Sequence, residues 1–138
     1  MMADGHQLLE AARALVGVPF HLGGMSRDLG VDCVGLVVLA LRAVGRDAGP
    51  LPPYRLRQTT LTGFAPALAR SGLRDVAEAL QPGDVLALRP SPSQLHLAIS
   101  GEGGTLVHAH AGLRRVVHGP RPAEWPLLRH WRLAPSGD

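Results

Sequence analysis

The feature that most constrains the fold of this chain is an almost uninterrupted apolar run, CVGLVVLALRAV, at residues 33–44. A helix built from this run has apolar side chains nearly all round, and helices of that kind are buried. Its longest fully apolar part, residues 34–41, is far too short to cross a bilayer. The run therefore predicts a central helix that the rest of the chain must cover.

The hydrophobic pattern changes period along the chain. Helical spacing predicts helices at residues 6–16 and 33–44, a weaker one within 61–71 and a short one at 75–80. Alternation then predicts five strands separated by Gly- and Pro-rich turns, at residues 84–89, 95–100, 105–110, 113–118 and 128–133. This order indicates an α+β fold, with N-terminal helices packed on a C-terminal antiparallel sheet of about five strands. We expect one domain over residues 1–138.

Charge and composition argue against several classes of partner. The net charge is only +3, and the 14 basic residues are all arginines scattered along the chain. Without a basic stripe carrying interleaved aromatics, we expect no nucleic-acid partner. The N-terminus, MMADGH, has no basic stretch followed by an apolar one, so we expect synthesis in a cytoplasm without a signal peptide, and no membrane partner. A mildly positive surface is compatible with an anionic polymer such as a cell wall.

The only cysteine, Cys33, stands at the start of the predicted central helix. Alone it can neither form an internal disulfide nor hold a zinc ion. Asp32 is a good N-cap. A cysteine in the first turn lies at the positive end of the helix dipole, which stabilises a thiolate. The position fits a nucleophile, although a buried cysteine that only packs is the simpler alternative.

A cysteine nucleophile needs an imidazole, and strand alternation selects candidates among the seven histidines. His96 shares a face of its strand with Ala98, which we expect to let a helix pack closely. His108 and His110 share a face of the next strand. An odd-numbered hairpin loop, such as a three-residue loop at residues 101–103 with a left-handed glycine, places His96 and His108 on one face. His108 and His110 could instead chelate a metal, but no carboxylate or second cysteine joins them at metal-ligand spacing.

These blocks together resemble a known family, the NlpC/P60 cysteine peptidases. The resemblance spans nearly the whole chain, and the blocks that carry it occur in the family's order: GVPF with Gly23-Gly24, then DCVGL from Asp32, LQPGDVL from Leu80, HLAI from His96 and LVHA from Leu106. The Asp-Cys-x-Gly-Leu block followed by a histidine strand is the specific part of this pattern.

The resemblance implies a fold and a set of roles. The fold would be a circularly permuted papain-like one, with the cysteine helix packed on an antiparallel sheet. Cys33 would be the nucleophile, His96 the general base, and His108 the residue that orients the imidazole of His96. The implied activity is hydrolysis of peptidoglycan stem peptides, with no cofactor.

The chain departs from the family beside the paired glycines. Many members have a tyrosine whose hydroxyl lies near the nucleophile, and this chain has Phe20. Loss of such a donor can cost on the order of a hundredfold in rate. His21 could substitute for it. We therefore take Phe20, His21 and Asp32 as candidate substrate-binding or oxyanion residues.

The compact form, with HAGLRRVV at residues 110–117, is most similar to the branch found in phage tails and gene transfer agents. This implies a tail-tip component that acts in the periplasm or at the cell wall, with tail-tip or baseplate proteins as partners. Two alternatives stay open. One is a structural tail component with weak or no activity, and the other is an acyltransferase or amidase on the same fold.

Overall fold

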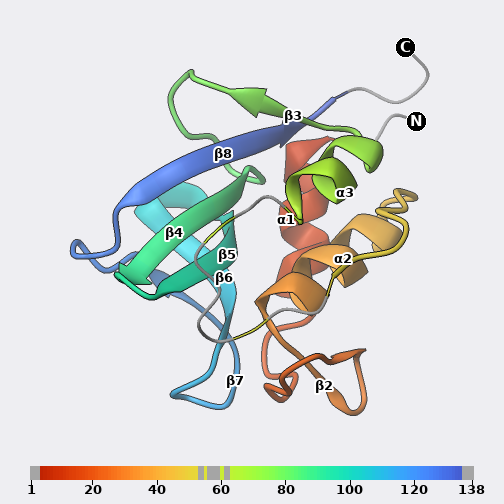
Figure 1. Ribbon diagram of the computed structural model, residues 1–138, viewed down its shortest axis with the longest axis vertical. Coiled ribbons are helices and arrows are strands. Elements are labelled where there is room, and N and C mark those ends of the chain that lie inside the picture. Colours follow the sequence, from red (N-terminus) through yellow and green to blue (C-terminus); the bar gives the residue numbers. More distant parts are fainter. Residues whose placement is uncertain (1–3, 53–54, 56–59, 61–62, 135–138) are drawn as a thin grey trace.

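The computed structural model describes residues 4–52, 55, 60 and 63–134. Three helices are present in this part: α1 (Gly5–Arg13), α2 (Cys33–Ala43) and α3 (Ala65–Arg70). They gather on one side of a sheet (Figure 1). Within the described residues, every helix falls short of the length and apolar character that a bilayer crossing requires.

In the described part of the chain, the main sheet is antiparallel throughout and has six strands in the order β3-β8-β4-β5-β6-β7. Its strands are β3 (Leu73–Val76), β4 (Val85–Ser91), β5 (Gln94–Ser100), β6 (Thr105–His110), β7 (Arg115–Pro120) and β8 (Leu127–Leu133). A small separate hairpin, β1 (Met25–Ser26) with β2 (Gly30–Val31), lies in the loop before α2. A short 3-10 helix, η1 (Glu102–Gly104), joins β5 to β6.

The α+β fold with helices on an antiparallel sheet is confirmed, and so is the central helix. The expected short helix at residues 75–80 is wrong, because residues 73–76 form β3 and pair with the last strand, β8. With β3 the sheet has six strands instead of the five expected. Because β8 lies between β3 and β4, the strand order is not that of a simple meander. The weaker helix is shorter than predicted, and positions 61 and 62 of that prediction lie outside the described residues.

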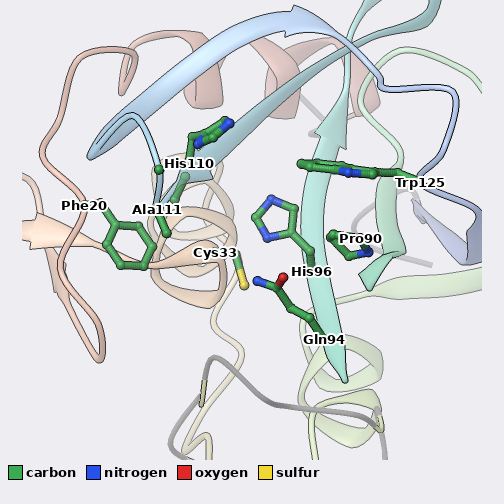
Figure 2. Close-up of a pocket in the computed structure, with 10 residues that line it drawn as sticks. Phe20, Cys33, Pro90, Gln94, His96, His110, Ala111 and Trp125 are labelled. Carbon is green, nitrogen blue, oxygen red and sulfur yellow. The ribbon is translucent and has the colours of Figure 1, made fainter. Parts of the chain in front are cut away.

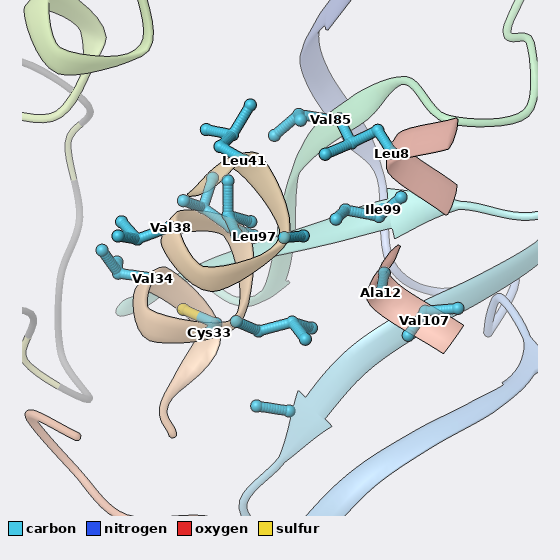
Figure 3. Close-up of a cluster of buried hydrophobic side chains, with 14 of the residues drawn as sticks. Leu8, Ala12, Cys33, Val34, Val38, Leu41, Val85, Leu97, Ile99 and Val107 are labelled. Carbon is cyan, nitrogen blue, oxygen red and sulfur yellow. The ribbon is translucent and has the colours of Figure 1, made fainter. Parts of the chain in front are cut away.

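Two apolar clusters cover the two faces of the sheet. The larger cluster joins α1 and α2 to odd-numbered strand residues such as Leu97, Ile99 and Val107 (Figure 3). The smaller cluster lies on the even-numbered face and contains Leu86, Leu88, Ala98 and Leu106. The expectation that Ala98 faces a packed helix is therefore wrong. The helices pack on the opposite face, where Leu97 and Ile99 bury more apolar area than an alanine can.

The start of α2 is pressed against the loop that carries the paired glycines. A Cβ placed on Gly35, in the first turn of α2, would overlap the carbonyl oxygen of Gly24. Asp32 caps the helix by accepting the backbone N–H of Gly35 at 2.8 Å. The glycine after Asp32-Cys33-Val34 is thus needed for the close approach that fixes where the helix begins.

We predict that Gly35→Ala destabilises the protein by about 1–3 kcal/mol, because the added methyl group is forced against backbone. The sign of this change in stability is informative, because replacing glycine by alanine inside a helix otherwise stabilises the protein by up to about 1 kcal/mol. Chemical denaturation of the variant measures the change. Gly119→Ala is the matched control, because a Cβ there meets nothing within 4 Å and should change stability by less than about 0.5 kcal/mol. Equal stability of both variants would contradict the close approach.

Candidate active site

A pocket of about 160 Å³ lies where the N-terminus of α2 meets one end of the sheet. The first residues of β5 and the last residues of β6 reach this end together because the two strands are antiparallel. The pocket is lined by Phe20, Cys33, Pro90, Gln94, His96, Ala109, His110, Ala111, Gly112 and Trp125. The fold therefore brings the only cysteine and one of the predicted histidines into one cavity.

Cys33 is 1% exposed, and its sulfur is not part of a disulfide bond. It is the first residue of α2, so its sulfur lies at the positive end of the helix dipole, where a thiolate is stabilised. Figure 2 shows the sulfur pointing toward the side-chain amide of Gln94, with the ring of His96 above it in this view. A cysteine placed in this way can attack a carbonyl group that enters the pocket.

Asp32 positions the cysteine without lining the pocket. Its two carboxylate oxygens accept the backbone N–H groups of Gly35 and Gly23, each at 2.8 Å. Burial raises the pKa of this carboxyl, and the backbone hydrogen bonds oppose that shift. The side chain joins the helix start to the preceding loop, and Asp32 is not among the residues that line the pocket.

His96 and His108 are hydrogen bonded to each other in a buried position. The Nε2 atom of His96 and the Nδ1 atom of His108 are 2.8 Å apart. The bond leaves Nδ1 of His96 on the side of Cys33, as the orientation of the ring in Figure 2 shows. This is the relationship expected of a general base and the residue that orients it.

The loop of the β5–β6 hairpin has an odd number of residues, as predicted, which brings these histidines to one face. It is longer than the three residues expected. Ser100 pairs with Leu106, so five residues, 101–105, separate the paired positions instead of three. The left-handed glycine is present as Gly103, with φ of 64°, inside η1. Adding two residues to a loop preserves the face of each side chain and shifts the pairing diagonally. The two histidines consequently meet from neighbouring positions on one face.

Trp125 covers the histidine pair from the outside. Its ring stands nearly perpendicular to those of His96 and His108, with centroids 5.5 and 5.6 Å away. Burial, followed by the neighbouring His108, lowers the pKa of His96 to about 3, and burial with His110 lowers that of His108 to about 4. Both rings are therefore neutral at pH 7 in the resting protein. A neutral imidazole is the form that can accept a proton from a thiol.

Among the pocket residues that were not predicted from the sequence as parts of the site, three have polar or aromatic side chains: Gln94, His110 and Trp125. The spacing of Gln94 and His96 on one strand could have revealed Gln94, since residues two apart share a face. His110 had been noted only as a possible metal ligand, and its Nδ1 atom accepts the backbone N–H of Leu113. Trp125 lies between β7 and β8, and no local pattern links that segment to β5.

The other candidates are divided between the pocket and the surface. Phe20 is half-buried and lines the pocket. His21 is exposed and is not among the lining residues. Within the described residues, no group of three or more metal-ligating side chains is close enough together to hold a metal ion.

Comparison with protein families gives a match that agrees with this geometry. The model of the NlpC/P60 family matches residues 17–125, which include the loop before α2, the cysteine, both histidines and Trp125. The chain therefore belongs to the NlpC/P60 family. No match was found among curated proteins.

Solved structures agree on the fold. NlpC1 of Trichomonas vaginalis superimposes with a TM-score of 0.66 at 18% identity, over 94% of this chain and 45% of that protein. The NlpC/P60 domain of the peptidoglycan hydrolase SagA gives 0.62 at 23% identity, over 96% of this chain and 99% of the domain. The peptidoglycan hydrolase RipB of Mycobacterium tuberculosis gives a TM-score of 0.61 at 22% identity, over 93% of this chain and 63% of the RipB chain. This chain thus spans less than half of the Trichomonas protein.

The buried histidine pair predicts a pH-dependent stability. Because both pKa values are lowered on folding, the unfolded chain binds more protons below its ordinary histidine pKa of about 6.5. Stability is therefore fully present above pH 6.5 and is lost as the pH falls toward 4. Between pH 7 and pH 5 we expect a loss on the order of 1–2 kcal/mol per histidine, measured by chemical denaturation.

His96→Gln should make this loss smaller, since glutamine does not titrate. His21→Gln is the control, because it removes an exposed histidine and leaves the buried pair intact. A wild-type stability that stays flat from pH 7 to pH 5 would contradict the burial of two neutral imidazoles.

Proposed function

We propose that the protein is a cysteine endopeptidase that cleaves amide bonds in peptidoglycan stem peptides. The observation that carries this proposal is the placement of Cys33 at the start of α2, in one pocket with a histidine that a second histidine orients. Membership of the NlpC/P60 family supports it, as does the fold shared with two proteins described as peptidoglycan hydrolases.

In the first half of the reaction, Nδ1 of His96 takes the proton from the Cys33 thiol while the sulfur attacks the scissile carbonyl carbon. A C–S bond forms, and the π electrons of the carbonyl move to its oxygen. The backbone N–H of Cys33, at the positive end of α2, is one donor to this oxyanion. The C–N bond then breaks as protonated His96 gives its proton to the leaving amine.

In the second half, water attacks the thioester and gives its proton to His96. The C–S bond breaks, the peptide leaves as a carboxylic acid, and the proton returns to the sulfur. His108 acts through the bond between its Nδ1 and Nε2 of His96, which holds the ring with Nδ1 toward the sulfur. The neutral resting form of His96 favours general-base activation of the thiol over a preformed thiolate–imidazolium pair.

We propose in addition that the protein works as a component of a phage or gene-transfer-agent tail tip, and reaches the cell wall there. The similarity of residues 110–117 to that branch supports this assignment. Part of this segment is β7, an edge strand of the sheet. Mass spectrometry of purified tail particles is the test, and particles without the protein would contradict a tail role.

Hydrolysis of purified peptidoglycan fragments tests the enzymatic proposal. Cys33→Ala should abolish turnover, and His96→Gln should lower kcat on the order of a thousandfold or more, because both take part in bond breaking. His108→Gln should cost less, on the order of 10- to 100-fold, since it acts only by orienting His96. Turnover is followed by chromatography of the released peptides.

His118→Gln is a suitable control, since His118 lies outside the pocket and bonds to Thr105. Equal turnover by the wild-type protein and Cys33→Ala would rule out the cysteine mechanism.

A further inference from the structure

A second polar side chain, that of Gln94, faces the reaction centre. Gln94 begins β5 and stands two residues before His96, so both side chains leave the strand on the same face. A register shift between Leu88 and Ser91 on the partner strand β4 marks a bulge here. Bulges redirect the chain next to functional sites, and this one brings Pro90 and Gln94 to the wall of the pocket.

The side-chain amide of Gln94 is aimed at the nucleophile. Figure 2 shows its nitrogen end directed toward the sulfur of Cys33, below the ring of His96 in this view. Within the described part of the chain, no hydrogen bond holds this amide in place. A primary amide offers two N–H donors, so both are available to a substrate that enters the pocket.

Among the described residues that line the pocket, the opposite wall supplies no such donor. There the aromatic ring of Phe20 lies beside Cys33, and a phenyl ring cannot donate a hydrogen bond to oxygen (Figure 2). His96 and His108 are engaged with each other, and Nδ1 of His110 accepts the backbone N–H of Leu113. Among the residues that line the pocket, the amide of Gln94 is thus the neutral donor directed toward the sulfur.

We propose that Gln94 is a catalytic residue that donates a side-chain N–H to the oxygen of the scissile carbonyl. The inference rests on the proposed thiol mechanism and adds a residue to it. When the sulfur adds to the carbonyl carbon, negative charge develops on the oxygen, and an N–H donor that already lines the pocket stabilises this charge. Gln94 neither gains nor loses a proton in this step.

The test separates attack on a carbonyl from simple reactivity of the thiol. Acylation of Cys33 by p-nitrophenyl acetate passes through an oxyanion, whereas alkylation by iodoacetamide does not. Gln94→Ala should slow acylation on the order of 10- to 100-fold and leave the alkylation rate within about twofold of the wild-type rate. Gln94→Glu, which has nearly the same shape but no N–H donor, should be at least as slow in acylation.

Ser93→Ala is the matched control, because Ser93 is the exposed neighbour in the β4–β5 turn and does not line the pocket. It should acylate at the wild-type rate. A rescue gives an independent readout: Phe20→Tyr places a hydroxyl donor on the opposite wall, so Gln94→Ala should cost less in that background than in the wild-type chain.

The outcomes are distinguishable from those of the proposed function. Equal slowing of acylation and alkylation would overturn the role of Gln94 at the oxyanion, as would no slowing of either. A wild-type protein that is acylated normally but does not cleave peptidoglycan would contradict the proposed substrate and leave the Gln94 result intact. A wild-type protein that cannot be acylated at Cys33 would overturn both proposals.

Discussion

The structure depends on one buried carboxylate, that of Asp32. It accepts a backbone N–H from the helix that follows, at Gly35, and another from the loop that precedes, at Gly23. These two bonds fix the angle at which the chain enters α2, and so they fix the position of Cys33. Because Gly35 lies against the carbonyl of Gly24, the entry has little room for other geometries. This packing requires the aspartate and the glycine of Asp-Cys-x-Gly at their positions. The cysteine between them is then held at the start of the helix, where its sulfur can react.

The second constraint is the division of the sheet into two faces. The apolar helices use the odd-numbered face of β5 and β6, which leaves the even-numbered face for the histidine pair and the smaller apolar cluster around Leu86 and Leu106. The cysteine reaches a histidine from the other face only at the end of the sheet, where α2 begins and β5 starts. This explains why the pocket is small and why Trp125 is needed to shield His96 and His108 from water.

Local pattern predicts much of this architecture, and long-range pairing accounts for what it misses. The apolar run predicts α2 and Asp32 predicts its cap, because both signals lie within one turn of helix. Strand alternation and odd loop parity place His96 and His108 on one face. In contrast, the pattern predicts a helix at residues 75–80 and misses β3, because the partner strand β8 lies more than fifty residues away. Trp125 likewise enters the pocket through tertiary packing that sequence spacing does not encode, whereas the two-residue spacing of Gln94 and His96 could have revealed Gln94. The extent of a single domain over residues 1–138 stays a prediction.

The proposed mechanism depends on the direction of the hydrogen bond between His96 and His108. If His96 is the base for Cys33, its Nε2 carries the proton and donates it to Nδ1 of His108, which leaves Nδ1 of His96 unprotonated toward the sulfur. The ¹⁵N chemical shifts of the histidine rings, measured by NMR at pH 7, report which nitrogen of each ring is protonated. The account predicts that His96 is neutral with its proton on Nε2. A His96 that carries its proton on Nδ1, or on both nitrogens, would contradict it, because such a ring could not accept the proton of the thiol.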